Sequence, residues 1–210
     1  MKRIDLETYP RREHFKLFYG MSYPYVGMTV NVDVTDLLAL CRESKWSFYV
    51  MVTHAVALAA DEVPEFRRRI DQGGIVEYEE CPTSHIELKS DGTYAYCTLR
   101  HHKPLEQFMQ EAEIARAAVR ENGSIEEDEA IQSMYYISTV PWVHFTQVIQ
   151  PVSCGEDSNP RFVWGKYEEN AQGRMMMPLS VLVHHALADG LHIAQFYAAF
   201  DKQVKALCGA

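Results

Sequence analysis

The strongest hydrophobic pattern in the chain lies near its C-terminus. Residues 175–184 are mostly Met, Leu and Val, which predicts a buried strand. From residue 190 to about residue 207 the apolar positions recur at helical spacing and predict a helix with one packed face. The connection between these elements reads His-His-Ala-Leu-Ala-Asp-Gly over residues 184–190. Functional groups concentrate where regular elements end, because a rigid scaffold can aim them there.

Helical spacing also appears at 47–62, where Pro64 ends the pattern, and at 105–121, where Asn122 and Gly123 end it. Shorter helices are predicted from about residue 11 to 18 and over 36–42. Apolar runs predict further strands at residues 26–32, 75–78, 85–88, 94–99, 134–138, 145–149 and 162–167. The helices and strands follow one another in mixed order. This order predicts an α+β fold, a two-layer sandwich with helices packed on a mixed β-sheet.

Length and composition indicate a soluble globular protein in which residues 1–210 form a single domain. Apolar residues make up 47% of the chain and charged residues 23%. No apolar run approaches the ~20 residues of a membrane span. Residues 1–10 lack the apolar core of a secretory signal, so a cytoplasmic location is expected.

The charge and the cysteines narrow the class of protein further. The net charge of −9 argues against a nucleic-acid partner, although an anionic cofactor needs only local cations. The acidic run at 126–129 is expected to be a solvated helix start. The five cysteines form no Cys-x-x-Cys pair, which favours free thiols in a reducing compartment.

The two adjacent histidines carry the clearest candidate chemistry. Neighbouring strand residues point to opposite faces, so His184 and His185 cannot both face one reacting atom if the strand continues. One is therefore expected to be scaffold and the other a general base, which a neutral imidazole can be near pH 7. Asp189 is expected either to cap the last helix or to brace the loop by pairing with a distant arginine.

The motif His-His-x-x-x-Asp-Gly is the signature of CoA-dependent acyltransferases, including dihydrolipoyl acyltransferases and peptide-synthetase condensation domains. Three other stretches narrow the resemblance to chloramphenicol acetyltransferases. They are Arg-Arg-Glu-His-Phe at 11–15, Ser-Thr-Val-Pro-Trp at 138–142, and Gly-Lys-Tyr at 165–167 with Pro-Leu-Ser at 178–180. Their order and spacing agree over essentially the whole chain, and by this likeness the chain resembles that family.

The resemblance assigns a role to each of eight residues. His185 would be the general base and Ser138 the hydrogen-bond donor to the tetrahedral oxyanion. Asp189 would pair with Arg11 to hold the loop, and His184 would be a packed partner. The residues expected to contact the cofactor are Trp142, Lys166 and Tyr167, and Trp142 is expected to lie in the core as well.

The implied activity is an acetyl-CoA-dependent O-acetyltransferase that acetylates the primary hydroxyl of chloramphenicol, a reaction linked to antibiotic resistance. A thioester is already activated, so direct transfer in a ternary complex needs one base and one oxyanion donor, and no metal. The resemblance also implies a homotrimer in which His185 of one subunit faces the acceptor pocket of its neighbour.

Departures from the family pattern keep the acceptor open. Ala188 replaces a cysteine, and Val163 replaces a threonine that organises a transition-state water in the family. The segment 16–25 is one residue longer, so no individual pocket roles are assigned to its aromatic residues, Phe18, Tyr19, Tyr23 and Tyr25. A different alcohol acceptor is the main alternative.

Two alternative functions belong to other classes of protein. One is a non-catalytic trimeric binding homologue, against which the joint presence of His185, Ser138 and Asp189 argues. The other is a metal-dependent hydrolase, which would need about three converging ligands and usually a His-Glu-x-x-His pattern. No such pattern occurs, and the pair His101-His102 is expected to lie on the surface.

Overall fold

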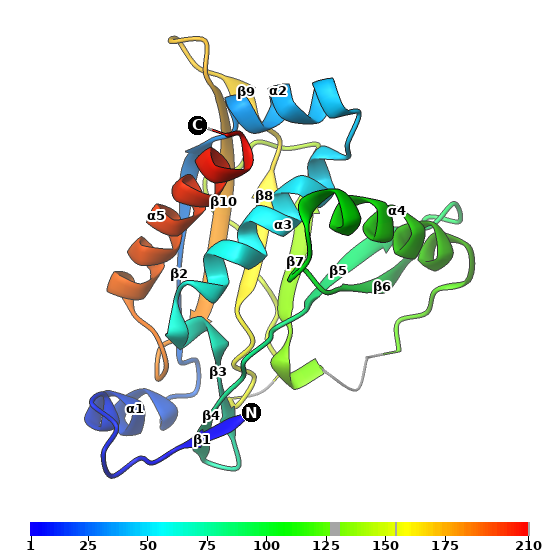
Figure 1. Ribbon diagram of the computed structural model, residues 1–210. Coiled ribbons are helices and arrows are strands. Elements are labelled where there is room, and N and C mark those ends of the chain that lie inside the picture. The colour runs from blue at the N-terminus through cyan, green and yellow to red at the C-terminus, as the bar shows by residue number, and fades with distance from the viewer. Residues whose placement is uncertain (127–130, 154, 210) are drawn as a thin grey trace.

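The computed structural model describes residues 1–126, 131–153 and 155–209, which form two β-sheets and five α-helices (Figure 1). Of the acidic run at 126–129, only Glu126 is among them, so the helix expected there lies outside the described residues. The same holds for Cys154. The other four cysteines are free thiols, as predicted from their spacing.

The larger sheet has seven strands. The pair His184-His185 lies at the end of one strand, and the pair His101-His102 follows another. The order of the sheet is β2-β10-β8-β7-β5-β6, with β9 added beside β10. The strands are β2 (Tyr25–Asp33), β10 (Met175–His184), β8 (Arg161–Gly165), β7 (Tyr135–Val140), β5 (Thr83–Leu88), β6 (Tyr94–Leu99) and β9 (Glu168–Glu169). The pairs β5–β7 and β7–β8 are parallel and the others antiparallel, so the sheet is mixed, as expected.

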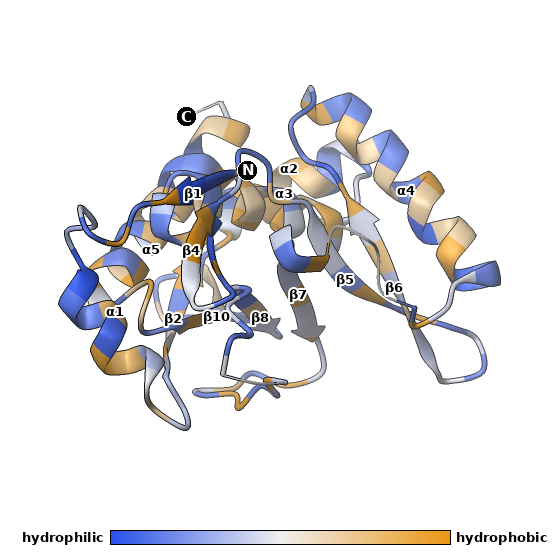
Figure 2. Ribbon diagram, turned by 90° about the horizontal axis from the view of Figure 1, so that it is seen from below, coloured by the Kyte–Doolittle hydropathy of each residue, from blue (hydrophilic) through white to orange (hydrophobic). Residues whose placement is uncertain are grey.

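The helices lie on one face of this sheet, so the two-layer α+β sandwich is confirmed (Figures 1 and 2). They are α2 (Thr35–Ser44), α3 (Phe48–Asp61), α4 (Leu105–Asn122) and α5 (Gly190–Leu207). The central helix α3 begins at Ser47, whose hydroxyl accepts the amide hydrogen of Val50. It is apolar almost all round because it packs on the sheet below and on neighbouring helices beside it.

Aromatic side chains join α5 to the sheet. The ring of Phe196 lies 5.0 Å from that of Phe162 on β8 and 5.7 Å from that of Phe66. All three rings are fully buried. Burying such rings is worth several kcal/mol, so this contact fixes α5, and with it the turn that precedes it, against the sheet.

A small sheet and a short helix cover the end of the molecule where β10 finishes (Figure 1). The sheet has the order β1-β4-β3, formed by Lys2–Ile4, Gly74–Glu77 and Arg68–Asp71. The helix is α1 (Arg12–Tyr19), and a 3₁₀ turn, η1 (Pro64–Arg67), connects α3 to β3. A second 3₁₀ turn, η2 (Ile131–Ser133), precedes β7.

One predicted strand is wrong, and three short strands, β1, β3 and β9, were not predicted. Residues 145–149 form no strand, because no strand of the described chain pairs with them; Val148 and Ile149 instead line an open cleft. The strand β3 lacks an apolar pattern because one of its two buried residues is Arg69, whose guanidinium donates to the carbonyls of Phe66, Ser133 and Met134. The described helices include none with the length and apolarity to cross a membrane.

Candidate active site

The strand β10 ends at His184, and this imidazole is held from both sides. Its Nδ1 accepts the amide hydrogen of Ala186 at 3.2 Å, and its Nε2 lies 2.8 Å from the carbonyl oxygen of Gly155. A carbonyl can only accept, so the proton is on Nε2 and the ring is neutral. Burial lowers the pKa of His184, which agrees with that state. His184 is therefore buried and uses both of its ring nitrogens in hydrogen bonds.

The next imidazole, that of His185, is oriented rather than enclosed. Its backbone amide donates to the carbonyl of Pro24 at 2.7 Å, and its ring stacks on Phe18 with 3.7 Å between centroids and a 12° interplanar angle. Its Nδ1 lies 3.1 Å from the carbonyl oxygen of Ala188. A proton must therefore be on Nδ1, and in the neutral ring the lone pair is then on Nε2. The neighbouring histidines thus take opposite tautomers, and only His185 has a free basic nitrogen.

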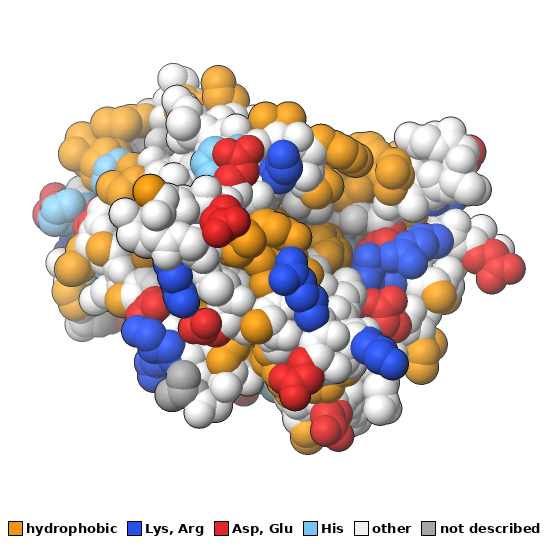
Figure 3. Space-filling view, turned by 90° about the horizontal axis from the view of Figure 1, so that it is seen from above, with side chains coloured by type: hydrophobic (Ala, Val, Ile, Leu, Met, Phe, Trp, Pro, Cys, Tyr) orange, Lys and Arg blue, Asp and Glu red, His pale blue; other side chains and the backbone are white. Residues whose placement is uncertain are grey.

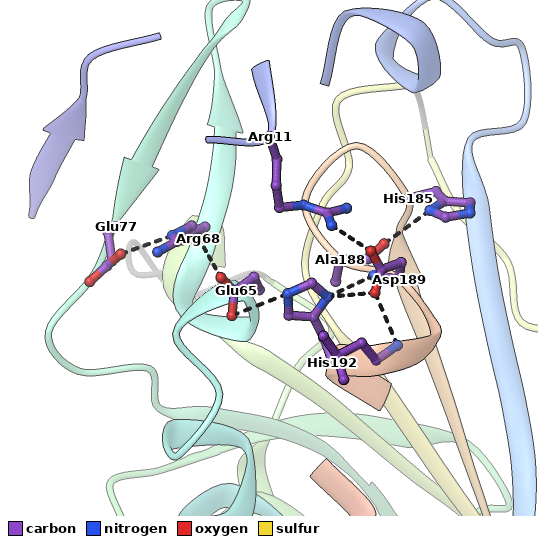
Figure 4. A network of polar contacts seen from close by, with 9 residues as sticks. Arg11, Glu65, Arg68, Glu77, His185, Ala188, Asp189 and His192 are labelled. Carbon is purple, nitrogen blue, oxygen red and sulfur yellow. Dashed lines mark hydrogen bonds and ion pairs between the residues drawn. The ribbon is translucent and has the colours of Figure 1, made fainter. Parts of the chain in front are cut away.

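The loop is braced by an ion pair that spans almost the whole sequence. The guanidinium of Arg11 donates to the carboxylate of Asp189, as the resemblance implied (Figure 4). Burial opposes ionisation of Asp189, but the hydrogen bond and charge of Arg11 outweigh it and lower the pKa of this carboxyl to about 2. Asp189 also accepts the amide hydrogen of Leu191 and caps α5. Both expectations for this residue therefore hold together.

The brace continues beyond the residues that the sequence singled out. The ring of His192 has its Nδ1 2.9 Å from Asp189 Oδ1 and its Nε2 3.7 Å from Glu65 Oε2. Glu65 in turn accepts from Arg68, which also donates to Glu77 on the small sheet (Figure 4). The small sheet is thus coupled to the loop of His185 by a continuous series of polar contacts.

Ser138 lies elsewhere, on β7, at the wall of an open cleft of about 810 Å³. The cleft is also lined by Val163, opposite Ser138 in the pairing of β7 with β8, and by the segment 148–153. No hydrogen bond within the described chain engages the Ser138 hydroxyl, so it can donate to a bound group.

Two of the three predicted cofactor contacts, Trp142 and Lys166, lie at the same end of the sheet, beyond the C-terminal ends of β7 and β8. Because β7 and β8 are parallel, the turn after β7, with Trp142, lies beside Lys166 after β8, and the amide of Lys166 donates to Val143. Trp142 is 74% exposed, so the expectation that it lies partly in the core is wrong. Tyr167 differs, since its ring packs against Phe48 of α3.

Basic side chains are present on the end of the molecule that carries α2. There, Lys and Arg side chains lie among acidic ones around an apolar hollow (Figure 3). Local cations are thus present on this face although the net charge of the chain is −9.

The predicted base and the predicted oxyanion donor are not brought together within one chain. Ser138 lies opposite Val163 in the sheet, and Val163 lies opposite Ser180. His185 follows Ser180 by five positions and lies two strands away from Ser138. Strand rise and spacing then put His185 roughly 15–20 Å from Ser138. Two groups that act on one reacting carbonyl must be within a few ångströms of it.

Two residues that contact the loop, Phe18 and His192, were given no role from the sequence although spacing could have indicated them. Phe18 lies seven positions after Arg11, on the same face of α1, so a helix that presents Arg11 to the loop presents Phe18 as well. His192 is at the third helical position after the cap Asp189, where a polar side chain reaches back. The expectation that His101 lies on the surface is wrong, because it is 1% exposed and bonded to Asp61.

Comparison with known proteins gives a consistent family. The family model described as "Chloramphenicol acetyltransferase" matches residues 1–201. A chloramphenicol acetyltransferase of Bacillus pumilus is 29% identical over 199 residues, 93% of this chain and 89% of that protein. One of Proteus mirabilis is 27% identical over 194 residues, 91% of this chain and 89% of that protein. A solved chloramphenicol acetyltransferase structure superimposes with a TM-score of 0.89 at 28% identity, covering 97% of this chain and 99% of that one.

Proposed function

The chain belongs to the chloramphenicol acetyltransferase family, a family of acyltransferases, and on that premise we propose that it transfers acetyl from acetyl-CoA to the primary hydroxyl of chloramphenicol. The observation that carries the proposal is the state of His185. Its Nδ1 is committed to the carbonyl of Ala188 and its plane is fixed by Phe18, which leaves Nε2 as the nitrogen that can act as a base. No covalent enzyme intermediate is needed, because the acyl donor is already activated.

The chemistry follows from two side chains. Nε2 of His185 takes the proton of the acceptor hydroxyl while that oxygen bonds to the thioester carbonyl carbon. The Ser138 hydroxyl donates a hydrogen bond to the resulting oxyanion. As the carbonyl re-forms, the carbon–sulfur bond breaks, the thiolate of CoA leaves, and it takes the proton back from His185. Acetyl ester and free CoA are the products, and His185 is regenerated.

The cofactor would lie along the edge formed by the turns after β7 and β8. Exposed Trp142 offers an aromatic face there, and the ammonium of Lys166, more than half exposed, offers a positive charge. Tyr167 is a weaker candidate because its ring is already packed against Phe48. Free cysteines, as found among the described residues, are typical of the reducing cytoplasm, and we propose that the reaction takes place there.

The separation of His185 from Ser138 supports a site shared between copies. A single chain supplies a base without an adjacent oxyanion donor, and a cleft with that donor but without a base. A cyclic trimer would bring the loop of one copy to the cleft of the next and complete three equivalent sites.

A different alcohol acceptor is the second candidate, and Val163 favours it. This side chain is buried in the wall of the Ser138 cleft, where family members carry a hydroxyl. Thiol release from acetyl-CoA, measured with chloramphenicol and a panel of other primary alcohols, separates the two. We expect turnover with chloramphenicol to be well above that with every other alcohol. Faster turnover with another alcohol would mean that this alcohol, and not chloramphenicol, is the acceptor. Absence of acceptor-dependent thiol release throughout would contradict acetyl transfer itself.

Mixed trimers test the shared site directly. His185→Ala and Ser138→Ala chains carrying different tags are co-expressed, and assemblies that hold both tags are purified. In each such trimer one of the three interfaces pairs an intact His185 with an intact Ser138, so about one third of wild-type activity should return. Trimers of either variant alone are the controls. If mixed trimers are no more active than these, both groups act within one copy.

A further inference from the structure

The second histidine pair meets a single carboxylate. His101 and His102 lie in the connection from β6 to α4, and Asp61 is the last residue of α3. The Nε2 atom of His101 is 2.5 Å from Asp61 Oδ2, and that of His102 is 3.0 Å from the same oxygen. His101 is buried, whereas the side chain of His102 is 47% exposed. One imidazole thus faces the interior and the other opens to solvent.

The carboxylate is held in place by a second contact. The hydroxyl of Tyr135 donates to Asp61 Oδ1 at 2.8 Å, which leaves Oδ2 for the two imidazoles. Such a partner for a carboxylate ligand is typical of metal sites, where it fixes the orientation of the ligand. A further buried imidazole, that of His54, lies two helical turns before Asp61 on α3.

The nature and spacing of the donor atoms point to a metal. One donor atom from each of Asp61, His101 and His102 lies within 4.8 Å of the other two. Donors at about 2.0–2.2 Å from a tetrahedral zinc ion are roughly 3.3–3.6 Å apart, so small side-chain rotations suffice. We propose that Asp61, His101 and His102 bind a divalent transition-metal ion such as Zn²⁺. Two imidazoles with one carboxylate suit such ions, whereas Mg²⁺ and Ca²⁺ prefer oxygen donors.

The surroundings provide an open side and negative charge. His102 lines a surface hollow together with Tyr78, Glu79 and Glu80. An ion can therefore enter from solvent, and a water molecule can complete its coordination from that side. The neighbouring carboxylates favour a cation. The bound ion would tie the end of α3 to the β6–α4 connection, and it shares no residue with the loop of His185.

The test uses the full chain after chelator treatment and removal of the chelator. Titration calorimetry with ZnCl₂ should give one site per chain, and MgCl₂ should give no heat of binding. At a free zinc concentration 100-fold above Kd, Tm should rise by about 5–10 °C. Cobalt should produce the visible absorption of a low-symmetry site with nitrogen donors. Absence of zinc binding would show that the cluster is held by hydrogen bonds alone and would overturn the proposal.

Variants assign the binding to these residues. His102→Ala removes a half-exposed ligand, so the fold should survive, which circular dichroism checks. Loss of supporting contacts alone costs 10–100-fold in metal affinity, so loss of this ligand should cost at least ~100-fold. Tyr135→Phe should weaken binding about 10- to 100-fold without removing a ligand. His14→Ala, which deletes an exposed imidazole of α1, is the matched control and should bind zinc as the parent does. Equal affinity in His102→Ala and the parent would place zinc elsewhere and refute the site.

Discussion

The loop after β10 and the cleft along β7 differ in how far one chain completes them. In the loop, His184 uses both ring nitrogens, His185 uses Nδ1, and Asp189 binds Arg11 as well as an amide of α5. In the cleft, the Ser138 hydroxyl has no partner in the described chain, and Ile149 on its rim is 85% exposed. The side chains of the loop are held in place by contacts within the chain, whereas the Ser138 hydroxyl in the cleft is left to bind a substrate or a second copy. Changes in the loop should therefore affect stability and activity, and changes in the cleft should affect activity alone.

The largest expected effect is that of His185→Ala. Removal of the base should lower kcat by about 10²–10⁴, because proton transfer from the acceptor then falls to water. KM for both substrates should change little, since the cleft and the cofactor edge are untouched. Steady-state kinetics check this, with His14→Ala as a control that keeps its activity. A rise in KM at unchanged kcat would instead assign His185 to binding.

The next effect is that of Ser138→Ala, which tests the cleft. Loss of one oxyanion donor should lower kcat by about 10²–10³. Because no hydrogen bond of the described chain depends on this hydroxyl, Tm should stay within about 1–2 °C of the parent, as for a neutral surface change. Kinetics and thermal unfolding on the same samples give both values. An unchanged kcat would remove Ser138 from the chemistry, and a large fall in Tm would break the contrast with the loop.

The brace of the loop should appear in the acid stability of the protein. Asp189 has a folded pKa of about 2, below its ordinary value, so its ion pair stabilises the fold fully above about pH 4. That stabilisation is lost as the pH falls through about 2. Asp189→Asn keeps a capping side chain but removes the charge. With Asp189 29% exposed, we expect a loss of about 1–2 kcal/mol in unfolding free energy at pH 7, and a flatter pH dependence between pH 4 and 2.

Neighbouring arginines supply the control for this brace. Arg11→Val should lower both stability and kcat, because Asp189 and the turn it holds lose their partner. Arg12→Val removes an exposed pair with Glu7 and should cost no more than about 0.5 kcal/mol. Chemical denaturation and kinetics distinguish them. Equal, small effects of the two substitutions would mean that the long-range pair does not hold the loop.

The elements with long, regular patterns could be predicted from the sequence. The strand 175–184 and the helix starting at residue 190 have the bounds that their apolar spacing predicted. The segment 145–149 failed because alternation alone does not reveal whether a neighbouring strand exists. The strand β3 was missed because Arg69 occupies its core position, and only the tertiary structure supplies the carbonyls that satisfy it.

In the candidate site, too, features carried by neighbouring residues could be predicted, whereas contacts between residues far apart in the sequence could not. The neighbours Asp189 and His185 carry a local motif, and the pairing of Asp189 with Arg11 followed from resemblance alone. Nothing local to His101 indicated Asp61, which lies 40 positions earlier, so the pair was assigned to the surface. The dipeptide His-His alone therefore does not predict which groups its two imidazoles contact. At a strand end its rings separate, whereas in an irregular connection both reach one oxygen.

The smallest predicted effect concerns Val163, in the wall of the cleft. This residue is buried opposite Ser138, where related enzymes carry a threonine, so Val163→Thr adds a hydroxyl close to the proposed oxyanion donor at nearly constant volume. One additional hydrogen bond to the reacting groups is worth about 0.5–1.5 kcal/mol, so kcat with chloramphenicol should rise about 2- to 10-fold. Val163→Ala, which changes the bulk without adding a donor, is the control. If Val163→Thr is no faster than the parent, the valine is not what limits turnover, and the acceptor must be sought among other alcohols.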